Sequence, residues 1–211
     1  MRHQKIIYLV VLFISCSFFC KGVFSQNKSR IGISLLADKA STAGARAAFG
    51  ISFERMVNKH NSAEIGIYYR TTIDDNVKVY SPSSGGNFVI TEQYFILEKF
   101  VSIPLLYNYK SNTINISIGA SADIYTGWEE KKHVTNPPAS MPVHLQSYKF
   151  DHKLLWGAMA KISKSFKVSS KLVIEPYVYV NPIFTPYSLY SKGFSETRLY
   201  YGGALTTKYI F

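Results

Sequence analysis

The sequence predicts an all-β fold, an eight-stranded antiparallel up-and-down transmembrane β-barrel with short periplasmic turns and long extracellular loops. Three observations lead to this prediction. Eight segments alternate apolar and polar residues with a period of two, as expected for strands with two different faces. The connections between these segments are alternately short and long. The last segment ends at the aromatic Phe211, which indicates a strand in contact with lipid.

The N-terminal residues 1–25 are predicted to be a secretory signal that is removed. Arg2 and Lys5 precede an apolar run, residues 6–20, that is too short to span a membrane as a helix. Cleavage after Ser25 leaves one expected domain over residues 26–211. Both cysteines of the chain lie within the signal, so the mature protein needs no disulfide framework.

The charge of the chain is basic but dispersed. The formal net charge is +11, and removal of the three bases in the signal leaves +8. The bases form no tract of the kind that binds nucleic acid, so no nucleic-acid partner is expected. Beyond the signal no apolar run approaches the roughly 20 residues of a transmembrane helix. A membrane protein with this sequence must therefore cross as a closed sheet.

The first four segments cover residues 30–37, 47–57, 62–73 and 100–109. In each, apolar side chains occupy every second position opposite Gly, Ser, charged or mixed residues. These alternate apolar residues are Ile31, Ile33, Leu35, Phe49, Ile51, Phe53, Ile65, Ile67, Tyr69, Val101, Ile103, Leu105, Tyr107 and Tyr109.

The last four segments cover residues 114–125, 154–166, 171–182 and 198–211. Residues 114–125 show the cleanest alternation in the chain, and the terminal segment places its aromatic and leucine residues on one face. The alternate apolar residues are Ile114, Ile116, Ile118, Ala120, Ala122, Ile124, Trp156, Ala158, Ala160, Ile162, Leu172, Ile174, Val178, Val180, Leu199, Tyr201, Leu205, Tyr209 and Phe211.

The connections separate into two groups. Residues 58–61, 110–112 and 167–170 are predicted hairpin turns. Residues 38–46, 74–98, 127–153 and 183–196 are predicted long loops. An even number of strands then returns the N- and C-termini to the same side, the periplasmic side of a barrel.

The polar face is expected to line the interior. A base on the lipid face near the midplane costs about 2–4 kcal/mol, so ionised residues of the strands should point inward. Tyr68, Tyr177 and Tyr179 are expected to bridge these charges by hydrogen bonds. Because an eight-stranded barrel is filled by its own side chains, no diffusion pore is expected. The predicted lumen charge network consists of Glu54, Glu64, Arg70, Asp123, Lys161, Glu175 and Arg198.

Two prolines fall within predicted strands. Pro104 and Pro176 each remove one backbone donor from the ladder. They predict bulges or local shifts of register at these positions.

Residues 100–109, which read FVSIPLLYNY, carry a family resemblance. This strand resembles the pattern "aromatic, x, x, Ile-Pro-Leu-Leu, x, x, Tyr" of the outer-membrane β-barrel family widespread in Bacteroidota, which includes PorT-like proteins. Gln26 after cleavage, the glycine in residues 114–125 and the terminal Phe211 are also similar, so the likeness covers the mature chain.

The resemblance implies a small barrel of the OmpA and OmpX size class in the outer membrane of a Gram-negative bacterium. It implies a structural or accessory protein of the cell envelope, with a possible link to a secretion or gliding apparatus. It also implies that the barrel assembly machinery reads Tyr209 and Phe211 as a C-terminal assembly signal.

The long loops suggest contacts outside the barrel. Cations and aromatic residues of the loop over residues 127–153 are expected either to contact lipopolysaccharide headgroups or to be solvated beside an ordinary aromatic girdle. Residues 88–97 have strand character, so the third and fourth strands are expected to project as a hairpin with an edge for a protein partner. The predicted headgroup or partner contacts are Trp128, Lys131, Lys132, Tyr148, Lys149 and Lys153.

Two alternatives to this reading are open. Some eight-stranded barrels resemble acyltransferases or deacylases of lipid A, but His60, His133, His144 and His152 show no triad or metal-site spacing. No catalytic residue, metal or cofactor is therefore predicted. A soluble lipocalin-like calyx is the other alternative, and it would place the apolar face inside.

Overall fold

The computed structural model of the chain describes residues 28–40, 46–82, 88–135, 153–185 and 197–211. All regular elements of this part are strands. No helix among these residues is long and apolar enough to cross a bilayer. The strands are β1 Ser29–Ala40, β2 Arg46–Met56, β3 Asn61–Pro82, β4 Phe88–Lys110, β5 Asn115–Thr135, β6 Leu154–Ser163, β7 Phe166–Lys167, β8 Leu172–Pro182 and β9 Leu199–Ile210.

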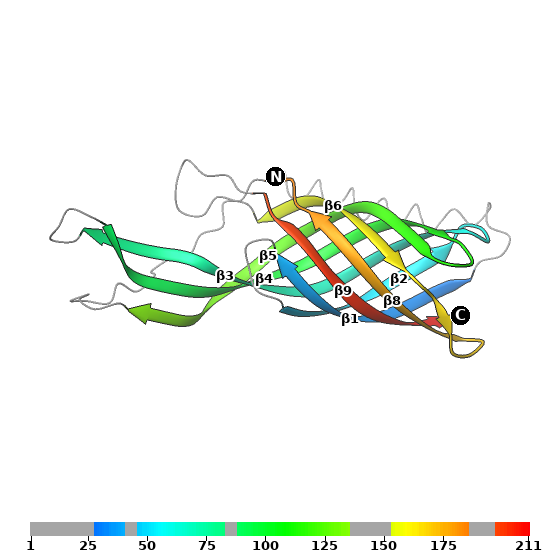
Figure 1. Cartoon of the computed structure of the whole chain (residues 1–211). Helices are drawn as coiled ribbons and strands as arrows, with labels where there is room; N and C mark the ends of the chain where they lie inside the picture. The colour runs from blue at the N-terminus through cyan, green and yellow to red at the C-terminus, as the bar shows by residue number, and fades with distance from the viewer. Residues whose placement is uncertain (1–27, 41–45, 83–87, 136–152, 186–196) are drawn as a thin grey trace.

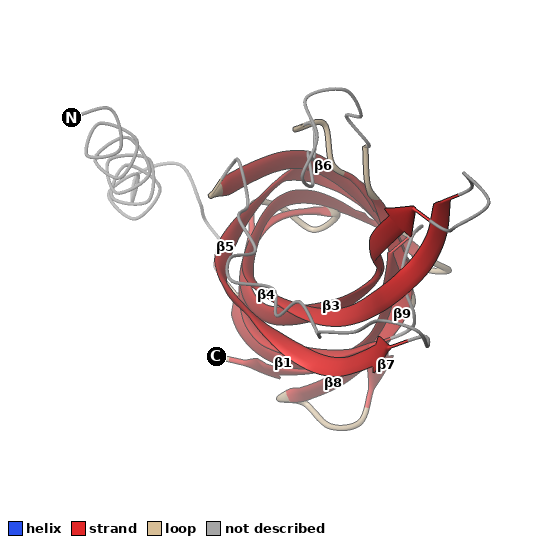
Figure 2. Cartoon of the chain, turned by 90° about the vertical axis from the view of Figure 1, so that its left-hand side faces the viewer, coloured by secondary structure: helices blue, strands red, loops and turns tan. Residues whose placement is uncertain are grey.

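The strands form a closed antiparallel barrel, seen along its axis in Figure 2. From β1 to β6 each strand pairs with the next in chain order, β8 pairs with β9, and β9 pairs with β1. Pairing of β6 with β8 closes the ring. The short β7 continues the line of β6, because both pair with β8 in the same register. The predicted eight-stranded up-and-down barrel is therefore confirmed, with β6 and β7 as one interrupted strand.

One end of the barrel carries only tight turns, between Met56 and Asn61, Lys110 and Asn115, and Lys167 and Leu172. We call it the short-turn end. The start of β1 meets the C-terminal residue there, since Ser29 and Phe211 exchange backbone hydrogen bonds of 3.2 and 3.0 Å. Pairing of β1 with β9 thus continues to the last residue.

Strands β3, β4 and β5 are about twice as long as the others, with 22, 23 and 21 residues. The C-terminal parts of β3 and β5 and the N-terminal part of β4 leave the barrel and form a three-stranded extension, visible at the left of Figure 1. The prediction of a long loop over residues 74–98 is thus wrong, because most of these residues belong to paired strands and only residues 83–87 connect β3 to β4. The predicted projecting hairpin is present. Residues 127–135 also belong to a strand rather than to a loop, because they pair with β4 and so satisfy their backbone groups.

The predicted irregularity at the prolines is wrong at Pro104. The pairing of β4 keeps one register on both sides of Pro104. A proline removes one N–H from the ladder, and the pairs of Pro104 and Ile103 with β3 are missing, yet the pairs on either side keep the same register. The bulges lie instead in the extension, at Asp74/Val77, Val79/Tyr80, Phe95/Ile96 and Lys99/Phe100.

Pro176 interrupts the ladder without shifting it. The nitrogen of Lys164 donates to the Pro176 carbonyl oxygen at 3.2 Å, but the proline has no N–H to return the bond. The strand breaks there, so β6 ends at Ser163 and β7 begins at Phe166. The register against β8 is the same on either side.

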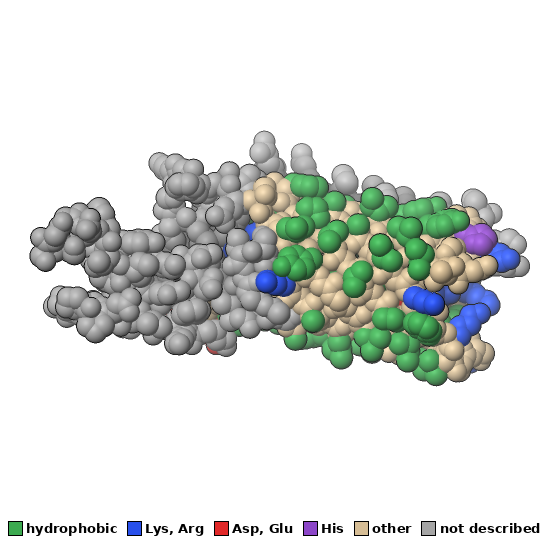
Figure 3. All heavy atoms as spheres, viewed as in Figure 1, with side chains coloured by type: hydrophobic (Ala, Val, Ile, Leu, Met, Phe, Trp, Pro, Cys, Tyr) green, Lys and Arg blue, Asp and Glu red, His purple; other side chains and the backbone are tan. Residues whose placement is uncertain are grey.

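Side chains alternate strictly between the outside and the inside of the barrel. The outward row is apolar and exposed, as in Ile33 (64%) and Ile118 (63%), whereas the adjacent Ser34 and Ser117 are 0% and 1% exposed. Apolar side chains consequently cover the barrel wall, as Figure 3 shows for one face. The hydrophobic surface is on the outside and the polar residues are inside.

Candidate functional site

The barrel interior is filled in layers along the axis, and β8 passes through each of them. From the short-turn end, its inward residues are Val173, Glu175, Tyr177, Tyr179 and Asn181, and Ile183 follows just after the strand; all six are buried. The other strands supply residues of matching kind at each level. The layers are a carboxylate cluster, a tyrosine layer, an arginine cluster and an apolar layer, followed by one further ion pair.

The carboxylate cluster is centred on Lys208 of β9. Its ammonium group lies 3.0 Å from Glu54 Oε2, 3.1 Å from Glu64 Oε2 and 3.2 Å from Glu175 Oε1. Glu54, Glu64 and Glu175 come from β2, β3 and β8, so one lysine joins four strands. Because Lys208 is 1% exposed, these interactions are poorly screened by water.

Three more bases complete this cluster. Lys161 Nζ lies 2.8 Å from Glu64 Oε1 and 3.8 Å from Glu175 Oε1. Lys110 pairs with Glu54, and Arg30 Nη1 approaches the same carboxylate at 3.8 Å. Three carboxylates therefore face four bases, counting Lys208, and the cluster carries one excess positive charge.

Hydroxyl and amide groups add hydrogen bonds to the same three carboxylates. Ser62 donates to Glu54 at 2.5 Å, Asn108 donates to Glu64 at 3.3 Å, and Ser165 donates to Glu175 at 3.0 Å. This matters because a buried charge is tolerated only when it is paired and hydrogen-bonded.

The tyrosine layer separates the carboxylate cluster from the arginine cluster. Tyr68, Tyr177 and Tyr179 pack with Leu36, Leu106 and Met159. Lys161 lies over the Tyr177 ring, 5.1 Å from its centroid, as a cation–π contact. Gly50 and Gly66 make room for Tyr68, because a Cβ at either position would lie 2.3 Å from its ring.

Arg70 of β3 holds the arginine cluster together. Its Nε lies 2.6 Å from Asp38 Oδ2, and its Nη1 lies 3.4 Å from Asp123 Oδ2 and 3.3 Å from Asn181 Oδ1. The guanidinium also covers the Tyr200 ring at 4.7 Å. Asp38, Asp123 and Asn181 come from β1, β5 and β8, so this cluster too joins four strands.

The lumen is closed again toward the extension. Phe100, Leu155, Ile183 and Tyr200 form an apolar cluster, all 2% exposed or less. Beyond it, Arg198 pairs with Glu98, which is 0% exposed. This succession of layers leaves the described part of the lumen filled.

All seven residues of the predicted lumen network lie inside the barrel, each 4% exposed or less. They do not form one network: Glu54, Glu64, Lys161 and Glu175 lie in the carboxylate cluster, Arg70 and Asp123 in the arginine cluster, and Arg198 in the last pair. Five charged residues of these clusters are absent from the predicted set, namely Arg30, Lys208, Lys110, Asp38 and Glu98. Lys208 was recognisable from the polar register of its strand. Asp38, Glu98 and Lys110 fall in segments assigned to loops or turns.

The residues predicted for headgroup or partner contacts are only partly described. Trp128 is half-buried on β5, and Lys153 is exposed just before β6. Lys131 and Lys132 lie on the extension part of β5 rather than in a loop. Tyr148 and Lys149 lie outside the described residues.

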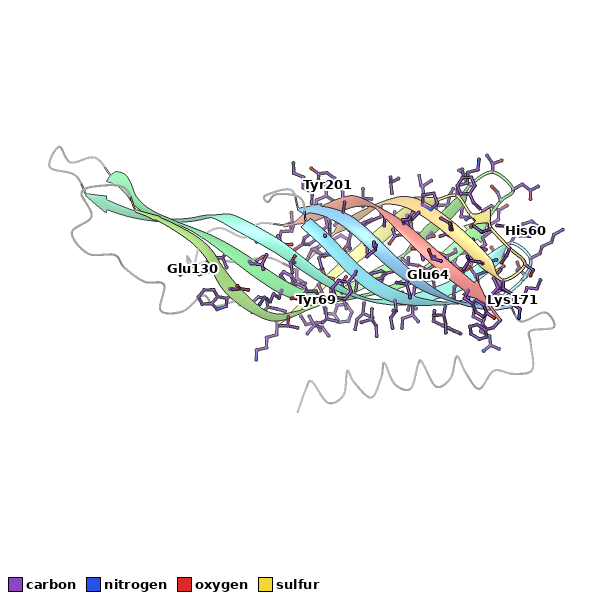
Figure 4. All side chains as sticks on the ribbon, turned by 90° about the horizontal axis from the view of Figure 1, so that it is seen from below. His60, Glu64, Tyr69, Glu130, Lys171 and Tyr201 are labelled. Carbon is purple, nitrogen blue, oxygen red and sulfur yellow. The ribbon has the colours of Figure 1, made fainter. Side chains whose placement is uncertain are left out.

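The aromatic residues on the outer wall gather near its two ends. Tyr107, Tyr109, Tyr209 and Phe211 are exposed toward the short-turn end, and the Phe211 ring lies 6.5 Å from that of Phe53. Near the extension, the exposed aromatic residues are Phe49, Tyr69, Trp156 and Tyr201. Figure 4 shows Tyr69 and Tyr201 there, with His60 and Lys171 at the opposite end. Two such girdles flanking an apolar band are typical of transmembrane barrels.

The histidines provide no assembled reactive site in the described part of the chain. His60 lies in the turn after β2, where its Nδ1–H donates to the Lys110 carbonyl oxygen at 3.1 Å. His133 lies on β5, and His144 and His152 lie outside the described residues. Among the residues whose positions are described, no group of three or more His, Cys, Asp or Glu could hold a metal.

Comparison with known proteins gives matches in structure alone. No family model matches the chain, and no curated protein matches it. The outer membrane protein OprG from Pseudomonas aeruginosa has a similar structure, with 13% identity and a TM-score of 0.51 over 88% of this chain and 95% of OprG. Ail, the attachment invasion locus protein of Yersinia pestis, matches with 11% identity and a TM-score of 0.45 over 88% of this chain and 99% of Ail. The likeness to OprG shows that the fold is that of a small outer-membrane β-barrel.

Proposed function

We propose that the chain is a small integral outer-membrane protein of a Gram-negative bacterium, with a structural or accessory role and a lumen filled by its own side chains. The observation that carries the proposal is the apolar outer wall between two aromatic girdles, around a core of buried ion pairs. A contiguous apolar surface around a whole barrel is unfavourable in contact with water. A soluble calyx would need the opposite arrangement, with the apolar row inside.

Labelling of adjacent residues tests this orientation. The mature chain has no cysteine of its own, so single-cysteine variants report one site each. Leu205→Cys and Ile118→Cys, which are 50% and 63% exposed, should react with a thiol probe confined to the bilayer. Their neighbours Thr206→Cys and Ser117→Cys, 2% and 1% exposed, are the matched controls and should not react. Reaction of the controls alone would reject the proposed location.

The proposal includes the topology and the biogenesis of the protein. Residues 1–25 act as the secretory signal, both termini face the periplasm, and the barrel assembly machinery reads Tyr209 and Phe211. The exposure of both aromatic side chains at the end of β9 supports this reading, because a receptor can reach them. Detergent-free release into the periplasm would contradict it, whereas heat-modifiable migration of a membrane extract is expected.

The three-stranded extension supports an accessory role. Beyond Ile124, β5 has no strand partner on the side away from β4 among the described residues. Such an edge offers backbone groups that an envelope protein can pair with. We further propose that the chain belongs to the PorT-like group of Bacteroidota and is linked to secretion or gliding. Lipopolysaccharide phosphates are the proposed lipid partners of Lys131, Lys132 and Lys153.

Deletion of residues 76–91 tests the accessory role. The variant removes most of the projecting hairpin and leaves five residues between the paired Asp74 and Ile96. We expect normal assembly of the barrel and loss of protein neighbours in crosslinking of intact cells. Unchanged crosslinking would show that the extension is not the partner surface.

We propose no enzymatic activity. A lipid A acyltransferase or deacylase needs a nucleophile with an oriented base at the outer rim. His60, whose side chain is described, lies at the opposite, short-turn end. Assay of the purified barrel with lipid A should show no acyl transfer or release.

A further inference from the structure

The short-turn end holds a basic cavity that the lumen layers do not account for. Its volume is about 250 Å³, and its lining includes Arg30, Lys59, His60, Lys110, Asn112 and Lys167. These residues come from β1, from the turn after β2, from the end of β4 and the turn that follows it, and from β7. The cavity thus lies where two neighbouring turns and two strands meet at the mouth of the barrel.

The charges of this end are of one sign. The described residues 28–30, 55–61, 109–115 and 163–172 contain eight lysines and arginines and no aspartate or glutamate. Figure 3 shows bases and a histidine gathered at this end of the molecule. Clefts lined by one sign of charge raise the local concentration of opposite ions.

The carboxylates below the cavity do not neutralise it. Glu54 is the nearest one, and it already pairs with Lys208 and Lys110. Arg30 reaches Glu54 only at 3.8 Å, and its buried Nε has no hydrogen-bond partner in the described structure. Lys59 and Lys167 have no ion-pair partner among the residues that the structure describes.

Most of the neutral groups around the cavity already have hydrogen-bond partners in the protein. The Asn115 amide donates to Ser165 at 2.9 Å, and Ser165 donates to Glu175 at 3.0 Å. His60 is fixed by its bond to the Lys110 carbonyl oxygen. The groups left to bind a ligand are therefore the cations, with the Asn112 amide beside them. Guanidinium and ammonium groups in this arrangement suit an oxyanion.

We propose that this cavity is a binding site for a single oxyanion of the phosphate type, presented from the periplasm. The periplasmic direction rests on the proposed function, whereas the site itself rests on the cavity alone. A volume of about 250 Å³ lies just below the range of about 300–1,000 Å³ that is usual for sites of drug-sized ligands. This is enough for one such anion and its nearest waters, and too small for a large organic ligand. Arg30, Lys59 and Lys167 bind the anion.

Titration with inorganic phosphate tests the site in the full mature chain, folded in phosphatidylcholine nanodiscs at low ionic strength. We expect saturable binding of one phosphate, seen as shifts of the amide resonances of His60 and Asn112. The variant Lys59→Gln with Lys167→Gln should weaken binding at least tenfold. The matched control is Lys164→Gln with Lys171→Gln, which removes the same charge from the same end but outside the cavity lining, and it should change affinity less than twofold.

Two results would overturn the proposal. One is the absence of saturable binding, and the other is an equal loss in both double variants, which would indicate diffuse surface attraction. Heat-modifiable migration of every variant reports separately that the barrel is folded in lipid. A failed phosphate titration therefore does not contradict the proposed outer-membrane role. Failure to show heat-modifiable migration would likewise contradict the outer-membrane role and not the phosphate site.

A second arm of the experiment identifies the source of the anion. In nanodiscs that contain phosphatidylglycerol, a lipid headgroup that occupies the cavity competes with inorganic phosphate and lowers its apparent affinity. An unchanged affinity shows that the cavity takes a free anion from solution. Either result supports the site, because both require the same cations.

Discussion

At the scale of single residues, Lys208 decides how the carboxylate cluster is held. It is the one described base that contacts Glu54, Glu64 and Glu175 together. Removing one member of a buried ion pair costs more than the pair contributes, because the remaining charge stays buried without compensation. Glu175 depends on Lys208 most, since its other base, Lys161, lies at 3.8 Å.

The substitution Lys208→Met is therefore expected to lower the free energy of unfolding by about 3–5 kcal/mol. Urea titration in phospholipid vesicles, followed by tryptophan fluorescence, measures this change. Lys171→Met, at an exposed turn position, is the control and should change stability by less than about 0.5 kcal/mol. A loss for Lys208→Met as small as that of the control would mean that the cluster is hydrated and not a closed layer.

Two adjacent glycines of β9 give a second test at this scale. A Cβ at Gly202 would lie 2.2 Å from the Ala37 carbonyl oxygen of β1, whereas a Cβ at Gly203 would find its nearest atom at 3.7 Å. Gly202→Ala should cost about 1–3 kcal/mol through overpacking at the β1–β9 seam. Gly203→Ala should be neutral or slightly stabilising in the same urea titration. Equal effects of the two variants would show that β9 does not approach β1 as described.

At the scale of the elements, the seam between β6 and β8 is the weakest part of the ring. Its ladder is interrupted opposite Pro176, whereas the pairing of β4 with β5 runs continuously beside the barrel lumen. Fewer backbone bonds hold this seam, so local opening should be easier there.

Amide hydrogen exchange tests this weakness. Residues of β6 and β7 near the break, such as Ser163 and Phe166, should exchange faster than residues of β5 at a similar distance from the turns. Pro176→Val restores a backbone N–H that can donate to the Lys164 carbonyl oxygen. The position faces outward and is exposed, so it accepts an apolar side chain. Exchange at the seam should become slower in this variant. An unchanged rate would place the cause of the opening elsewhere.

At the scale of the whole molecule, the layered lumen predicts that the barrel does not conduct ions. Each layer spans the ring from wall to wall, as the arginine cluster does through β1, β3, β5 and β8. An ion crossing the barrel would have to displace several buried ion pairs and two aromatic or apolar layers. The interior therefore acts as structural packing, as expected for a barrel of this strand number.

Planar-bilayer recordings of the purified protein should show no stable ohmic conductance. The variant Arg198→Ala removes the pair nearest the extension, yet it should stay closed because four layers lie beneath it. A steady conductance of the native protein would contradict the filled lumen. A conductance that appears only in Arg198→Ala would make the Glu98–Arg198 pair the sole barrier.

Much of this architecture follows from the sequence because a strand has only two faces. Charged residues at alternate positions, such as Glu64 and Arg70, define the interior as soon as the opposite row is apolar, and the tight turns define one end of the barrel. The sequence predicts less well how far β3, β4 and β5 continue into the extension. Residues 74–98 contain Gly, Pro and Ser that resemble a loop, and their pairing depends on a third strand, β5, that continues beside them.

Eight two-faced strands with an apolar outside could be predicted from the amino-acid order alone, because period-two alternation acts within each segment. Which charges meet depends on the closed barrel. Lys208 and Glu54 are 154 residues apart, and their contact depends on how the closed ring staggers its strands, which no local pattern encodes. The basic cavity at the short-turn end has the same origin, since its cations come from separate turns that only ring closure brings together.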